Sequence, residues 1–244
     1  MNNNINSIFR IHALLTKIPS VAQNTQVLEV WAQLFELTES DSNKKAAVVA
    51  ERLGWLLKEV DLAKSELKNT GHPASLYESV LIHLEHAFSP MLLPSIWSSV
   101  QQYLDAQTIQ TLAIYSQVVP NEEELIKEYD LNELYARISE LEEFLKNSEL
   151  PIRLQTLIER HINLIRQALA EYPIAGAKAL IEARRSAVGE LLELKHQFND
   201  VPKKSVELNK LSELWENVNA VADNALKGYG LIEIGQKVID LLSK

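Results

Sequence analysis

Residues 44–68 read KKAAVVAERLGWLLKEVDLAKSELK, with apolar side chains recurring every three or four positions along the whole stretch. This spacing places the apolar side chains on one face of an α-helix. Side chains that can cap a helix precede the stretch at residues 38–43, and Gly71 and Pro73 follow it. The stretch therefore predicts one long helix that buries a single face.

Helical spacing recurs through the rest of the chain, while the alternation typical of strands is nearly missing. The 244 residues include only 7 Gly and 8 Pro, which favours few and long helices. Further apolar stripes run from Ile5 to Leu15, Asn24 to Leu37, Ala74 to Phe88, Leu134 to Leu145, Leu154 to Leu169, Pro173 to Asn199, Leu208 to Ala225 and Ile232 to Leu242. The sequence predicts an all-α fold, an irregular multi-helix bundle of about ten helices without a significant sheet.

The composition changes from uncharged to acidic near Pro120, and residues 121–149 carry 10 acidic and 3 basic side chains. We therefore expect an N-terminal helical subdomain over residues 1–120 and a C-terminal helical subdomain over residues 121–244. One continuous domain is the alternative.

Three local expectations follow from the same patterns. Asn121 is predicted to cap a helix whose first turn holds the acidic residues 122–124, where the helix dipole favours negative charge. Pro173 is predicted to begin a new helix. The helix over residues 74–88 is apolar nearly all round, so we expect it to lie at the centre of the fold.

Residues 87–121 contain a single charged side chain, Asp105. Such a charge-poor segment is expected either in the interior or on a contact surface. If it is a contact surface, its partner-binding candidates are Met91, Leu92, Leu93, Ile96 and Trp97. Pro90 and Pro94, with many Ser and Gln residues, argue against a continuous membrane span.

The absence of cysteine excludes a disulfide framework, a thiolate zinc site and a cysteine nucleophile. The N-terminal residues have no basic region and no long apolar region, so no secretory signal is expected and the cytoplasm is the expected location. No apolar run approaches the length of a transmembrane helix. No cofactor motif is complete, because the glycines of residues 228–235 fit neither phosphate-binding loop.

Two short motifs suggest metal ligands. His83 and His86 lie three residues apart on a predicted helix, and Glu193 with His196 matches the Glu-x-x-His element of di-iron bundles. The sequence holds no second Glu-x-x-His element. These four residues are therefore weak candidates, and no catalytic or cofactor-binding residue is predicted.

A net charge of −9 makes nucleic acid an unlikely partner, because nucleic-acid binding requires neutralisation of phosphates. Five arginines could gather if their two helices pack together, namely Arg153, Arg160, Arg166, Arg184 and Arg185. Without interleaved exposed aromatic residues, this group favours an ion-pairing surface over a nucleic-acid track.

The segment from Tyr172 to Leu191, which reads YPIAGAKALIEARRSAVGEL, resembles a stretch of uncharacterised small all-helical bacterial proteins associated with mobile elements. The resemblance implies a bacterial or phage-borne helical protein with a role in phage defence. It transfers no catalytic residue.

These observations favour a non-enzymatic cytoplasmic helical protein that acts through contacts with another protein or with its own copies. Two alternatives stay open. One is a metal-dependent or nuclease-like enzyme that uses the histidine motifs, and the other is a membrane-surface or toxin-like protein that uses the charge-poor segment.

Overall fold

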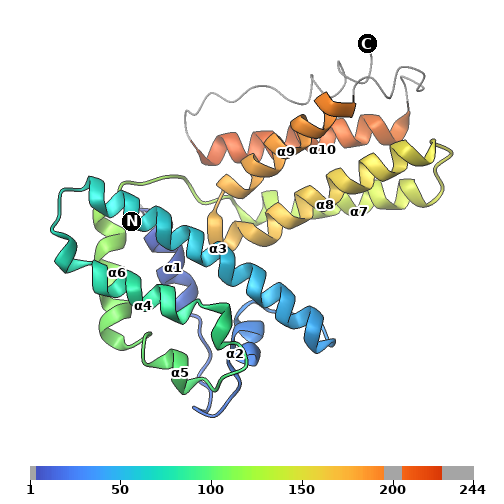
Figure 1. Ribbon diagram of the computed structural model, residues 1–244. Helices are drawn as coiled ribbons and strands as arrows, with labels where there is room; N and C mark the ends of the chain where they lie inside the picture. Colours follow the sequence, from blue (N-terminus) through green and yellow to red (C-terminus); the bar gives the residue numbers. More distant parts are fainter. Residues whose placement is uncertain (1–3, 195–204, 227–244) are drawn as a thin grey trace. The chain divides into compact units, whose positions relative to one another are not determined.

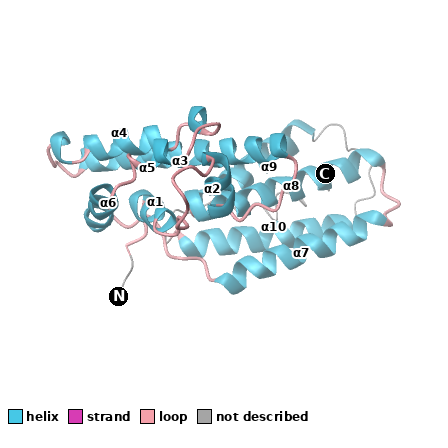
Figure 2. Cartoon of the chain, turned by 90° about the horizontal axis from the view of Figure 1, so that it is seen from below, coloured by secondary structure: helices cyan, strands magenta, loops and turns pink. Residues whose placement is uncertain are grey.

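The computed structural model describes residues 4–194 and 205–226, and these residues form ten α-helices and two short 3-10 helices without a strand (Figure 2). The all-α multi-helix fold predicted from the sequence is confirmed. By their contacts the residues divide into two compact units, one of residues 1–122 with 173–175 and the other of residues 123–172 with 176–244. The predicted boundary between residues 120 and 121 stays a prediction, because a division by contacts does not test whether either part folds alone.

The first unit is organised around α3 (Ser42–Asn69), the long helix predicted from residues 44–68. Asp41 caps it by accepting from the backbone N–H groups of Asn43 and Lys44. Its buried face contacts α1 (Ser7–Leu15), α2 (Val27–Leu34) and α4 (Glu78–Ala87), and α1 also contacts α6 (Ala106–Val118) (Figure 1). The remaining elements of this unit are η1 (Ala74–Leu76), η2 (Pro90–Leu92) and α5 (Ser98–Gln101).

The core of the first unit includes an aromatic cluster around Trp31, which is fully buried. Its ring lies 5.8 Å from the rings of Phe88 and Trp97, in edge-to-face contacts, and 5.9 Å from the ring of Phe35. Such geometry adds to the free energy gained from burying the rings alone. Residues on three separate segments are held together by this cluster.

The second unit contains α7 (Glu128–Lys146), most of α8 (Ile152–Ala175), α9 (Lys178–Leu194) and α10 (Val206–Ala225). Helix α10 contacts both α7 and α9. The predicted stripe of α7 is buried at Leu134, Ile138 and Leu141. The predicted C-terminal stripe from Ile232 to Leu242 lies outside the described residues.

Several predicted helix ends are wrong, because residues expected in a helix form contacts with distant segments instead. The helix predicted from Asn24 begins only at Val27, since Thr25 and Val27 form backbone hydrogen bonds with Trp97 and Ser95. The helix predicted over residues 74–88 divides into η1 and α4, and Ile82 is exposed, so this segment is not buried all round.

Pro173 does not begin a helix, contrary to the prediction. It lies in the last turn of α8, and the helix ends before Gly176, three residues later, which has a φ of 70°. A proline so near the C-terminus of a helix costs only the hydrogen bond of its own missing N–H and a local distortion. Glycine tolerates the left-handed conformation at the break, so the next helix, α9, begins at Lys178.

Candidate functional site

The predicted partner-binding residues of the charge-poor segment fall into three classes of exposure. Met91 is 84% exposed and Ile96 is 49% exposed, while Leu92 and Leu93 are half-buried. Trp97 is buried against Trp31 and belongs to the core. The segment is thus interior at some positions and surface at others, which a count of charges could not distinguish.

Helix α6 carries the C-terminal part of this charge-poor segment and has no charged residue of its own. Asp105 caps it by accepting from the backbone N–H of Thr108 at 2.7 Å, and this hydrogen bond is the main cause that lowers the pKa of Asp105. The sole charge of the segment therefore stabilises the N-terminus of α6, as expected from the direction of the helix dipole.

One side of α6 is fixed to the first unit. Its buried residues Thr108, Leu112 and Ser116 recur every four positions and face inward. At its C-terminal end, the side-chain amide of Asn6 donates to the carbonyl groups of Ser116 and Val119 at 2.9 and 3.0 Å. These contacts determine which side of α6 is turned outward.

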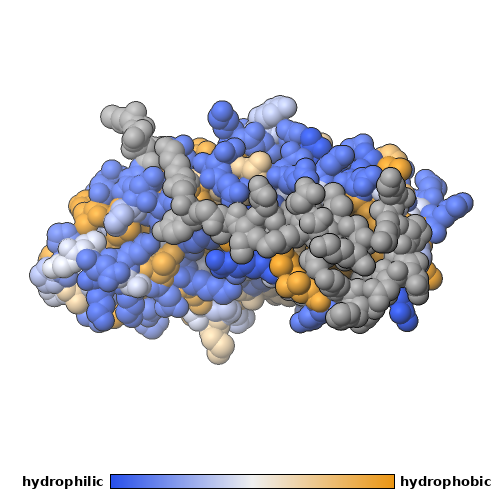
Figure 3. Space-filling view, turned by 90° about the horizontal axis from the view of Figure 1, so that it is seen from above, coloured by the Kyte–Doolittle hydropathy of each residue, from blue (hydrophilic) through white to orange (hydrophobic). Residues whose placement is uncertain are grey.

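The outward side of α6 carries exposed residues that are all uncharged. We call this set the α6 surface, and its members are Gln107, Gln110, Ile114, Gln117 and Val118. Ile114 is 64% exposed and Val118 is 36% exposed. Tyr115, also on α6, packs edge-to-face on the ring of Tyr77, with the ring centroids 6.2 Å apart. On the one face that Figure 3 shows, the visible apolar residues form small areas among hydrophilic ones.

The histidine pair predicted as metal ligands packs against a tyrosine. His86 stacks on Tyr103 with ring centroids 5.1 Å apart, and His83 meets the same ring edge-on. His83 Nδ1 also lies 3.3 Å from the hydroxyl of Thr108. Within residues 4–194 and 205–226, no group of three His, Asp or Glu side chains could hold a metal ion. Glu193 is exposed, and His196 lies outside the described residues.

The arginines of α8 and α9 form the ion pairs that the sequence predicts. Arg160 pairs with Glu190 at 3.0 Å, and Arg166 pairs with Glu142 at 2.6 Å. Arg184 is buried and reaches Asp223 at 3.5 Å. Arg160 and Arg166 thus form ion pairs at the surface of the second unit, whereas the ion pair of Arg184 lies inside it.

A buried histidine that sequence reasoning missed lies in the second unit. His161 is fully buried, and its Nδ1 accepts a hydrogen bond from Trp215 Nε1 at 3.0 Å. Because an indole N–H can only donate, the proton of the neutral imidazole must be on Nε2, 3.7 Å from a carboxylate oxygen of Glu190. Burial lowers the pKa of His161 to about 4, with the charge of Glu190 acting in the opposite direction.

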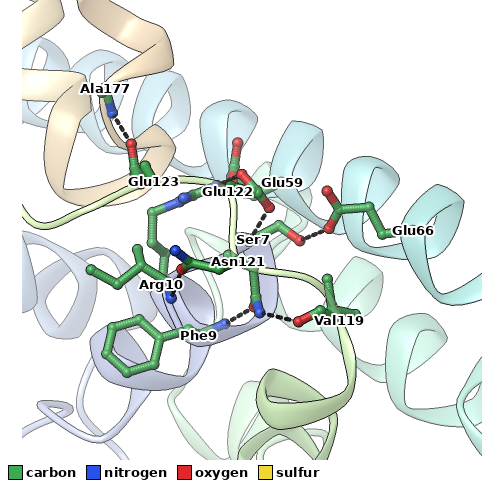
Figure 4. Close-up of polar contacts among 12 residues, drawn as sticks. Ser7, Phe9, Arg10, Glu59, Glu66, Val119, Asn121, Glu122, Glu123 and Ala177 are labelled. Carbon is green, nitrogen blue, oxygen red and sulfur yellow. Dashed lines mark hydrogen bonds and ion pairs between the residues drawn. The ribbon is translucent and has the colours of Figure 1, made fainter. Parts of the chain in front are cut away.

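The acidic residues 122–124 do not begin a helix, contrary to the prediction, because α7 starts only at Glu128. Glu122 instead accepts from the buried guanidinium of Arg10 at 2.8 Å and from the backbone N–H of Ser7 at 2.6 Å (Figure 4). Arg10 also pairs with the buried Glu59 at 2.6 Å and donates to the carbonyl of Ile174 at 3.1 Å. This network is structural, since it satisfies the buried guanidinium from several segments.

Glu123 has a similar structural role in the second unit. One carboxylate oxygen accepts from the backbone N–H of Ala177 at 2.6 Å, at the start of α9. The carboxylate occupies the space beside Gly176, where an added Cβ would lie 1.9 Å from its Oε1. A distant side chain thus caps α9, which no local sequence signal could reveal.

The comparisons with known proteins add no relative. No family model, no curated protein and no solved structure matches the chain. Each helix in the part of the chain that the structure describes is too short or too polar to span a bilayer.

Proposed function

We propose that this protein acts without catalysis, by binding another protein chain through the α6 surface. The observation that supports the proposal is an exposed, charge-free helix side with Ile114 at its centre. Charged residues are depleted at the centres of protein interfaces, where they would lose water without gaining a partner. Exposed isoleucine and glutamine side chains on a fixed helix meet this requirement.

The same surface argues against the alternative partners. Helices that lie on membranes carry Lys and Arg on their polar side, whereas α6 has neither. A nucleic acid would require cations, and the chain has a net charge of −9. A protein partner is the class of ligand that an uncharged helix side fits best.

The proposal includes the setting that the sequence suggests. The resemblance of residues 172–191 supports a bacterial protein associated with mobile elements or phage defence. We place the contact in the cytoplasm.

Site-specific photo-crosslinking in the native host tests the proposal. A photoreactive amino acid at Gln110 reports on the α6 surface, and the same group at Ile152, which is 80% exposed on α8, is the control. We expect a crosslinked protein product from position 110 that disappears with Ile114→Lys, and no such product from position 152.

Circular dichroism and a thermal unfolding curve establish that the Ile114→Lys protein is folded. Equal products from positions 110 and 152, no product from position 110, or a product that survives Ile114→Lys would overturn the proposal.

A further inference from the structure

The last described residue, Leu226, lies next to the segment that leads into α7. Helix α10 ends at Ala225, and the carbonyl of Ala225 accepts from the backbone N–H of Glu124 at 2.7 Å. Residues 227–244 lie outside the described residues. These 18 residues therefore start beside Glu124, at one end of the second unit.

Two large apolar side chains are exposed at this end. Leu125 is 70% exposed, and Tyr129, in the first turn of α7, is 73% exposed. Among the described residues, the other exposed large apolar side chains of the second unit are Tyr135, Phe144, Ile152, Leu192 and Val206. Val206 begins α10, which is about 30 Å long, and Phe144 lies near that far end, because Lys210 Nζ is 4.5 Å from the centre of its ring.

The sequence after Leu226 has the pattern of a helix with one apolar side. Its apolar residues follow helical spacing and its charged residues fall between them, the apolar ones being Leu231, Ile232, Val238, Ile239 and Leu242. A helix of 12 residues is marginal by itself in water, and its apolar side needs a covering surface. We therefore expect this stripe to form a helix against other apolar residues.

The connection to this stripe is short. Five residue steps separate Leu226 from Leu231, and they span at most about 17 Å. The start of the stripe is thus within reach of Leu125 and out of reach of the far end of α10. Gly228 and Gly230 allow the sharp turn that returns the chain towards the end of α10.

We propose that residues 231–242 form a helix whose apolar side covers Leu125 and Tyr129 of the same chain. The charges agree with this occupant, because residues 227–244 carry three basic and two acidic side chains, whereas residues 124–130 carry one basic and three acidic ones. The covered residues belong to the second unit, so this contact is independent of the α6 surface.

Photo-crosslinking in the purified full chain tests which residues cover Tyr129. The probe p-benzoylphenylalanine replaces Tyr129, and the same probe at Ile152 is the control. Ile152 is 80% exposed and follows Ser148, whose hydroxyl donates to Glu207 at the far end of α10. We expect a crosslink within one chain, mapped by mass spectrometry to residues 231–242, from position 129 and not from position 152. A crosslink from position 129 to a second copy, no crosslink to residues 231–242, or equal crosslinks from both positions would overturn the proposal.

Two variants of equal net charge test whether the apolar side makes the contact. Ile232→Lys with Ile239→Lys places two charges in the stripe and should reduce the crosslink from position 129 about tenfold or more, because buried unpaired charges are costly. Asp240→Lys changes the net charge by the same amount on the polar side and should leave the crosslink intact. Loss of the crosslink in both variants, or in neither, would contradict the proposal.

Hydrogen exchange provides an independent readout. The amides of residues 231–242 should exchange about tenfold or more slowly in the natural chain than in Leu125→Asp with Tyr129→Asp. Because both residues are exposed in the described structure, the double variant should keep the second unit folded, which unchanged exchange in α10 establishes. Equal exchange of residues 231–242 in the two proteins would refute the contact.

Discussion

Acidification should destabilise the second unit through His161, the histidine buried beside Trp215. The pKa of His161 is lowered to about 4 in the folded protein, compared with about 6.5 in an unfolded chain. Between these two values the unfolded state binds a proton that the folded state does not. Stability from the neutral ring is therefore complete above pH 6.5 and is lost as the pH falls towards 4.

The size of the effect follows from the difference between the two pKa values. About 2.5 pKa units correspond to about 3 kcal/mol in total, and about 2 kcal/mol of this is lost between pH 7.5 and pH 5. Protonation also places a proton on Nδ1, the atom to which the N–H of Trp215 donates while the ring is neutral. The hydrogen bond between the two rings must then break.

The assay is urea unfolding at pH 7.5 and pH 5, followed by the indole N–H resonance of Trp215. His161→Gln is the matched variant, because an amide oxygen can accept from Trp215 and does not titrate. Natural protein should lose about 2 kcal/mol more than His161→Gln over this pH range. The same pH dependence in both proteins, or an imidazole of His161 that titrates near pH 6.5 in the folded state, would refute the reasoning.

Three further predictions concern the other contacts. Gly176→Ala should lower the free energy of unfolding by about 2 kcal/mol or more in a denaturant titration, because it strains a left-handed residue and displaces the Glu123 carboxylate that caps α9. Gly189→Ala on α9, where an added Cβ meets nothing within 4 Å, should instead raise it by up to about 1 kcal/mol. Glu59→Ala should cost about 3 kcal/mol in urea unfolding, since it removes a buried partner of Arg10, whereas Glu133→Ala, at a half-exposed pair with Arg137, should cost about 0.5 kcal/mol. Equal losses would contradict the structural role of the Arg10 network. Trp97→Ala should cost about 3–5 kcal/mol in thermal or urea unfolding, because the ring is buried, and Met91→Ala less than about 0.5 kcal/mol, because the side chain is exposed. A large loss from Met91→Ala would contradict the different roles of the two residues.

Local patterns predicted the helices well wherever the spacing of apolar residues within one helix determines which face is buried. The stripe of α3 is buried at Val49, Leu53, Leu56 and Val60, as its spacing indicates, because one helix face must be removed from water. The buried face of α7 follows the same rule. The ion pairs of Arg160 and Arg166 were also predictable, since both arginines lie on the outward side of an amphipathic helix.

Distant partners explain where the predictions failed. Asn121 and residues 122–124 look like a helix start, but Glu122 binds Arg10 and Glu123 binds the N–H of Ala177, far away in the sequence. A carboxylate gains more from a buried cation or a helix terminus than from its own first turn. The candidate site was partly visible as a charge-poor segment, yet only coordinates could separate the buried Trp97 from the exposed Ile114.

The sequence alone determined that this chain is all-helical, that residues 44–68 form one long helix, and that cysteine chemistry is excluded. These properties depend on composition and on spacing within one element. Only the tertiary structure decided which carboxylates cap helices, which histidine loses its charge, and which side of α6 faces the solvent. These properties depend on the burial and charge that other segments impose, and no local pattern carries that information.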